Sequence, residues 1–94
     1  MADTAEPEVQ IDNDKTRVTI WRFSPGASTG FHRHEYDYVI VPLAPGPLRQ
    51  VFADGSATVA ELEPGTSYFR QAGVEHDVVY DGETPFAFVE IEFK

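Results

Sequence analysis

The stretches PGASTGFHRH at residues 25–34 and GTSYFRQAGVEH at residues 65–76 contain all three histidines of the chain. On an extended strand, alternate side chains point to one side, so His32 and His34 share a side with Cα atoms about 6.6 Å apart. Two imidazoles at this spacing can share one metal ion at nitrogen–metal distances of about 2.0–2.2 Å. With His76 as third ligand, the pattern predicts a three-histidine metal site with positions left open for water or substrate.

The sequence around these stretches is typical of an all-β protein. Short runs rich in β-branched and aromatic residues are separated by Gly, Pro, Asp or Ser, and no 3.6-residue repeat appears. The dipeptide Asp54-Gly55 predicts a short hairpin with a type I′ turn. Composition alone does not separate a sandwich from a small barrel. We expect antiparallel strands at 17–23, 37–43, 48–53, 57–62, 67–70, 76–80 and 85–93.

The two histidine stretches resemble the two sequence motifs of the cupin superfamily. The first motif has a glycine shortly before His-x-His, as residues 25–34 do. The second runs Gly, five residues, Pro, any residue, Gly, two residues, His; Gly65, Gly73 and His76 keep this spacing, with Gln71 in the proline position. The resemblance covers most of the chain and implies a double-stranded β-helix, the small jelly-roll barrel of the cupins, with a metal in its mouth. The amino-acid sequence of these stretches is most similar to that of small single-domain cupins named for β-alanine degradation.

One position departs from the cupin pattern. The family usually has a Glu four or five residues after the second histidine, where this chain has Tyr38 and Val39. On an uninterrupted strand Tyr38 points to the same side as the histidines and supports a three-histidine site as a nearby donor. A β-bulge would instead turn Asp37 inward as a fourth ligand. A site that holds no metal is the remaining alternative.

Further side chains are candidates for the chemistry of the site. Tyr38 and Tyr68 are candidate catalytic acids or bases, although an ordinary tyrosine pKa lies near 10. Arg70 shares a strand face with Tyr68 and is a candidate for holding an anionic substrate with its guanidinium, with a surface ion pair as the alternative. Arg49 lies in an otherwise apolar strand, so it either lines the pocket or pairs with an acidic neighbour.

The resemblance also implies an activity. Cupins with three histidines and no glutamate include dioxygenases that cleave β-diketones or oxidise thiols on non-haem iron. Three imidazoles suit Fe(II), Zn(II), Ni(II), Cu(II) or Co(II). We therefore expect a metal-dependent, dioxygenase-like enzyme that acts on a small carboxylate or β-dicarbonyl metabolite. The alternative is a metal-dependent small-molecule binding or accessory domain without turnover.

The acidic composition makes some partners unfavourable. The chain has 16 Asp and Glu against 7 Lys and Arg, a formal charge of −9, and no cysteine. This charge repels phosphate backbones and anionic lipids, so we expect neither nucleic acid nor a membrane as partner. The absence of cysteine excludes disulfides and thiolate metal sites. No apolar run approaches the length of a membrane span and no signal peptide is recognisable, so we expect a cytoplasmic protein.

The 94 residues suffice for one domain. We expect an acidic N-terminal arm at residues 1–14, followed by a single cupin domain at residues 15–94. The arm contains five acids and no base, so we expect a solvated, loosely attached tail. An extra edge strand through Val9 and Ile11 is the alternative.

The last run, residues 85–93, predicts a contact between subunits. Strand alternation puts the odd-numbered residues from 87 to 93 on the expected buried face and leaves Phe86 and Phe88 on the other face. A barrel of this size has little interior of its own. Two large exposed rings therefore favour a homodimer.

Overall fold

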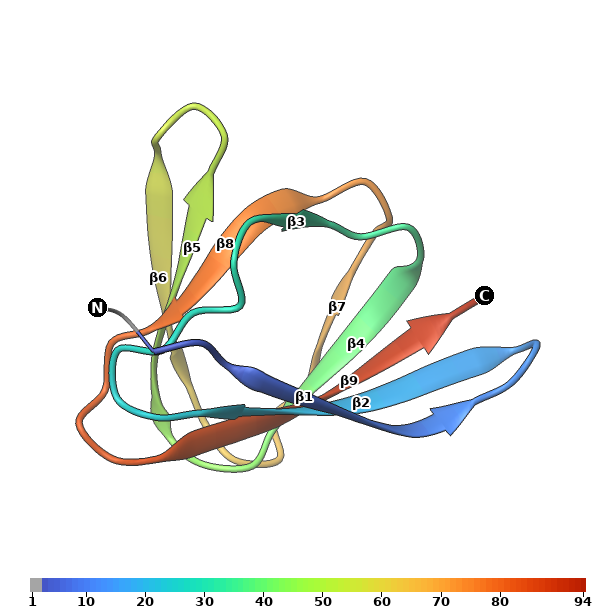
Figure 1. The fold of residues 1–94 in the computed structure, drawn as a ribbon, viewed down its shortest axis with the longest axis horizontal. Helices are drawn as coiled ribbons and strands as arrows, with labels where there is room; N and C mark the ends of the chain where they lie inside the picture. The colour runs from blue at the N-terminus through green and yellow to red at the C-terminus, as the bar shows by residue number, and fades with distance from the viewer. Residues whose placement is uncertain (1–2) are drawn as a thin grey trace.

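The computed structural model describes residues 3–94, which form nine β-strands in two sheets with antiparallel pairing (Figure 1). One sheet has the strand order β1-β2-β9-β4-β7 and the other the order β3-β8-β5-β6. This is the all-β, double-stranded β-helix that the sequence predicts. The strands are β1 (Glu6–Asp12), β2 (Thr16–Phe23), β3 (His32–Arg33), β4 (Asp37–Pro42), β5 (Gly46–Phe52), β6 (Ala57–Leu62), β7 (Tyr68–Arg70), β8 (Glu75–Tyr80) and β9 (Phe86–Phe93).

The two sheets roll around a shared interior because alternate side chains of each central strand point inward. In β8, His76, Val78 and Tyr80 are buried while the residues between them are not. Figure 1 shows β3 and β8 passing over one side of the roll and β2 and β9 over the opposite side. Residues 3–94 contain no helix long and apolar enough to cross a membrane.

An aromatic core fills one part of this interior. The rings of Phe23 and Phe88 have centroids 5.4 Å apart, and Tyr80 stacks on Phe86 at 4.7 Å. Along β8 and β9 the inward residues change from these rings to His76, Glu90 and the buried Glu92. The barrel therefore has an apolar end that stabilises it and a polar end that is available for chemistry.

The predicted facing of the last strand is wrong. Phe86 and Phe88 are both 3% exposed and belong to the core, whereas Phe93 is 44% exposed. The strand pairs with β2 on one side and β4 on the other, and its inward face also carries Glu90 and Glu92. A carboxyl group usually marks an outward position, but here it lies at the polar end of the interior. The exposed phenylalanines expected to bind a second subunit are thus core residues.

The N-terminal arm forms an edge strand instead of a loosely attached tail. β1 pairs with β2 from Glu6 opposite Arg22 to Asp12 opposite Arg17, with a bulge between Val9 and Ile11. All seven residues of β1 are exposed, so backbone pairing, not burial, holds the strand. Residues 1 and 2 of the arm lie outside the described part, and the domain boundary at residue 14 stays a prediction.

The hairpin at Asp54-Gly55 joins β5 and β6 as predicted, but its turn is of another type. A type I′ turn needs positive φ at both central residues. Gly55 has φ of 85°, whereas Asp54 does not have a positive φ. Asp54 Oδ1 instead accepts a hydrogen bond from the Ser56 N–H at 2.9 Å, which closes a longer loop.

Candidate metal centre

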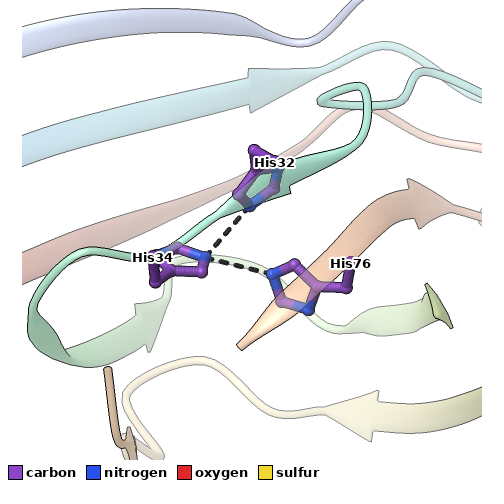
Figure 2. Close-up of side chains that lie close together, drawn as sticks. All are labelled: His32, His34 and His76. Carbon is purple, nitrogen blue, oxygen red and sulfur yellow. Dashed lines mark hydrogen bonds between the residues drawn. The ribbon is translucent and has the colours of Figure 1, made fainter. Parts of the chain in front are cut away.

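Strand pairing brings the three histidines together at the polar end of the barrel. β3 lies antiparallel to β8 with His32 directly opposite His76. Backbone hydrogen bonds fix His34 just beyond β3: its N–H donates to the Val74 carbonyl at 2.9 Å, and its carbonyl accepts from the Gly73 N–H at 2.8 Å. Figure 2 shows the three rings turned toward one another, and one ring nitrogen of each lies within 4.8 Å of the others.

Hydrogen bonds on the far side of two rings decide which nitrogen faces the centre. His32 Nδ1 lies 2.8 Å from the Gly30 carbonyl, and His76 Nδ1 lies 2.9 Å from Oε1 of Gln50. Both partners are hydrogen-bond acceptors, so in each neutral ring Nδ1 carries the proton and Nε2 keeps its lone pair. These partners hold the rings in the form that binds a metal.

The three Nε2 atoms lie close together but do not carry enough protons for a hydrogen bond at each contact. Nε2 of His34 lies 3.0 Å from Nε2 of His32 and 3.0 Å from Nε2 of His76. A neutral His34 has at most one proton on that nitrogen, so at most one of the two contacts is a linear hydrogen bond and the other brings two ring nitrogens together without one. Two nitrogen ligands about 2.1 Å from one ion lie about 3 Å apart at a right angle. The donor set therefore fits a divalent metal ion.

Burial keeps two of the rings neutral. Burial, and then the nearby His32, lower the pKa of His34 to about 4. Burial, followed by His32, His34 and Arg70, lowers the pKa of His76 to about 3. At neutral pH both rings have the lone pairs that a metal needs.

Tyr38, at the position where cupins usually have a glutamate ligand, packs against a histidine. Its buried ring stacks on His34 with centroids 3.9 Å apart and an interplanar angle of 18°. Burial raises the pKa of Tyr38, so its phenol stays protonated. Asp37, the alternative fourth ligand, is exposed and accepts a hydrogen bond from the Ala72 N–H at 2.8 Å. The three-histidine cluster of the described chain therefore includes no Asp or Glu.

A narrow cavity beside the histidines opens toward a wider pocket. The inner cavity has about 20 Å³, room for about one water molecule. The wider pocket, about 510 Å³, lies between β1 and the histidine strand and is in the size range of small-molecule sites. Both spaces are lined by Trp21, Thr29, His32, His34 and Glu90. A ligand can thus reach the histidines from the wider pocket.

The candidate substrate residues have different positions. Tyr68 lines the inner cavity. Arg70 lies exposed, with its guanidinium 4.6 Å above the Tyr68 ring. Arg49 forms an ion pair with Asp81, with nitrogen–oxygen distances of 3.0 and 3.1 Å. Neither arginine lines the cavity or the pocket, so for Arg49 the ion pair is the reading that the structure supports.

The sequence patterns miss several residues of the site. Gln50 orients His76, Thr29 lies 3.3 Å from His32 Nδ1, and Trp21 and Glu90 line both spaces. A signal was present for Glu90, because it has the strand parity of two core phenylalanines. In β9 the residues of this parity change from core phenylalanines to a carboxyl group at the site.

Comparison with known proteins supports this description. The cupin domain family matches residues 19–92. The chain belongs to the cupin family. This cupin is 50% identical over 90 residues to the β-alanine degradation protein BauB of Pseudomonas aeruginosa, covering 96% of this chain and 94% of the relative.

Solved structures show the same fold. A cupin domain from Bordetella pertussis Tohama I is 49% identical, with a TM-score of 0.95 over 100% of this chain and 97% of that chain. A cupin superfamily protein from Desulfitobacterium hafniense DCB-2 is 15% identical, with a TM-score of 0.75 over 99% and 80% of the two chains. The second likeness shows the fold alone. Together with the family match, these structures confirm the small cupin that the two motifs predict.

In the metal-free protein, His34 and His76 should stay neutral down to a pH far below the usual pKa of histidine. Their pKa values of about 4 and about 3 lie below the ordinary value of 6.5, so the unfolded chain takes up these protons first. The two rings therefore reduce the stability of the folded protein as the pH falls from about 6.5 toward 4 for His34 and toward 3 for His76. An NMR titration of the imidazole signals measures both pKa values. A midpoint near 6.5 for either ring would contradict the expectation.

Proposed function

We propose that this cupin holds one divalent metal ion on His32, His34 and His76. We further propose that it is a dioxygenase-like enzyme acting on a small carboxylate or β-dicarbonyl metabolite. The main support is the convergence of the three Nε2 atoms, with two contacts of 3.0 Å that lack the protons for two hydrogen bonds. Fe(II), Zn(II), Ni(II), Cu(II) and Co(II) all accept imidazole ligands. Three neutral ligands leave the full charge of the ion available to attract an anionic, chelating ligand.

The chain's own residues hold the histidine rings in place. A bound ion would supply Lewis acidity and, for iron or copper, electron transfer. Gln50 orients His76, and the stacked ring of Tyr38 orients His34. We propose Tyr38 and Tyr68 as catalytic residues. Burial raises the pKa of each, so they would donate hydrogen bonds to an oxygen atom of the substrate instead of acting as bases.

A non-catalytic function is the second candidate. The Pseudomonas relative is named a β-alanine degradation protein, which supports a role with a small metabolite. Such a role is also compatible with a metal-dependent binding or accessory domain. The narrow inner cavity, about 20 Å³, favours small ligands in either case. Turnover decides between the two.

Tag-free protein should bind one divalent ion per chain. His76→Ala removes one of three ligands and should abolish stoichiometric binding. Gln50→Ala keeps the ligands but frees the His76 ring, so we expect an affinity about 10- to 100-fold lower. Gln10→Ala, on the exposed strand β1, is the matched control and should bind like the wild type. Isothermal titration with zinc measures this, and wild-type affinity of His76→Ala would refute the site.

The enzyme proposal predicts oxygen consumption. Iron-loaded protein in aerobic buffer should consume oxygen with at least one member of a panel of β-dicarbonyls and small carboxylates, measured with an oxygen electrode. His34→Ala should abolish this uptake because it removes a metal ligand. Uptake that persists in His34→Ala would place the reaction elsewhere. Ligand binding without uptake, for iron, copper, nickel and cobalt alike, would establish the binding domain instead.

We also propose a homodimer, formed by the outer face of the five-stranded sheet. Residues paired across all five strands form one apolar row there: Ile11, Val18, Ile91, Val39 and Phe69. Five strands about 4.8 Å apart and about 20 Å long give a face of about 500 Å², which is smaller than the roughly 800 Å² per partner typical of a standard interface and in the range of a weak dimer. The row itself contains no acid, whereas Glu8 of β1 and Asp37 of β4 lie beside it on the same face, so we place the centre of the contact between two chains of charge −9 on this row.

Analytical ultracentrifugation tests this dimer. Wild-type protein should sediment as a dimer at about 100 µM, and Phe69→Lys should raise the dissociation constant at least tenfold because it buries a charge. Val59→Lys, at a residue 58% exposed on the other sheet, is the control and should leave the dimer intact. A monomeric wild type would refute the dimer. A dimer indifferent to Phe69→Lys and Val39→Lys would place the interface elsewhere.

A further inference from the structure

Two carboxyl groups lie buried on the inward face of β9 but share a single cation. Glu90 is 9% exposed and Glu92 is 5% exposed. Arg17 of β2 binds Glu92 with both arms of its guanidinium, Nε to Oε1 at 2.7 Å and Nη2 to Oε2 at 3.0 Å. Within residues 3–94 Glu90 forms no ion pair of its own. Glu90 is therefore the carboxyl group of this pair that can carry a proton.

The neighbours of Glu90 come from four strands. Arg17 and Trp21 lie on β2, Tyr38 on β4, Tyr68 on β7, and Glu92 on β9 itself. Burial, and then the charge of Glu92, raise the pKa of Glu90 to about 7, while Arg17 and Trp21 oppose this shift. Arg70, above the Tyr68 ring, is the other nearby cation. The hydrogen bonds of the described chain join Glu90 to none of the three imidazoles.

Glu90 lies where a ligand must pass. It lines both the inner cavity beside the histidines and the wider pocket outside it. Trp21 lines the same two spaces, and its buried indole Nε1 has no hydrogen-bond partner in the described chain, although it lies near enough to Glu90 to lower the pKa of that carboxyl. A buried N–H without an acceptor is costly. The site thus presents a ligand that reaches the histidines with a proton acceptor, Glu90, and beside it an indole N–H that faces the carboxylate but forms no close hydrogen bond to it.

We propose that Glu90 takes a proton from a neutral, weakly acidic ligand as that ligand binds at the three-histidine centre, and that the Trp21 N–H donates a hydrogen bond to the resulting anion. This inference rests on the proposed metal site. For a β-dicarbonyl, the bond broken is C–H between the two carbonyls, or O–H in the enol form. The electron pair stays on the ligand as an enolate, and the Glu90 carboxylate becomes a carboxylic acid. No oxidant is consumed.

The mechanism selects a class of ligand. An enolisable carbonyl compound arrives uncharged and transfers a proton to Glu90. The negative charge of the enolate therefore develops only beside the proposed metal ion. A ligand that arrives as an anion has no proton to give and is repelled by the ionised Glu90 carboxylate. Enolisable neutral compounds should therefore bind better than simple carboxylates of the same size.

Proton counting by calorimetry tests the proposal without turnover. Nickel-loaded protein is titrated with acetylacetone at pH 7.5 in two buffers of different ionisation enthalpy, and the difference in heat gives the number of protons released. Nickel is used because a water molecule bound to it stays protonated at this pH. The wild type should release measurably less than one proton per ligand, because the negative charge of the bound enolate raises the pKa of Glu90 above its value of about 7 in the free site. Glu90→Gln should release close to one. Glu61→Gln, at an exposed residue of β6, is the control and should match the wild type.

Each outcome decides a separate point. Equal proton release by wild type and Glu90→Gln, at unchanged nickel affinity, would overturn the role of Glu90 and leave the metal site intact. Nickel binding without acetylacetone binding would overturn the ligand class. Failure to bind nickel would overturn the proposed function itself. Trp21→Phe should keep the wild-type proton count but weaken acetylacetone binding about tenfold; an unchanged affinity would remove Trp21 from the proposal.

Discussion

The antiparallel pairing of β3 with β8 is the constraint on which the site depends. It sets His32 directly opposite His76, although 43 residues lie between them in the chain. Once these two are paired, backbone hydrogen bonds to Val74 and Gly73 fix the main chain at His34, and the stacked ring of Tyr38 positions its imidazole. Three imidazoles can then meet without any flexible loop. Strand pairing thus holds the ring nitrogens 3.0 Å apart, closer than their protons allow two hydrogen bonds to form.

The barrel makes this possible by dividing its interior along the strands. Aromatic packing around Phe23, Tyr80 and Phe88 stabilises one end, and this allows the other end to be polar. Burying polar groups there has a cost, which specific partners offset. The Gln50 amide forms a hydrogen bond with His76, and the Arg17 guanidinium donates hydrogen bonds to Glu92. Glu90 is left without such a partner, and unmet groups of this kind are where a functional site differs from a packed core.

Several expectations failed for one common reason. Strand alternation identifies two faces but does not say which is the inner one, and an acid was taken as a sign of the outside. In β9 this assigned Phe86 and Phe88 to the wrong face. For the arm, composition argued against burial, but β1 is held by backbone hydrogen bonds that depend little on composition. Arg49 likewise meets Asp81, a residue 32 positions away whose proximity no local pattern reveals.

The sequence by itself determined the strand texture, the cupin family and the identity of the three converging histidines, because periodicity and motif spacing are local properties of the chain. Only the tertiary structure decided what surrounds them: the ring of Tyr38 against His34, Gln50 behind His76, and Glu90 facing the cavity. These contacts join residues from different strands of the two sheets. Their register and facing are set by how the sheets close, which is a property of the whole barrel.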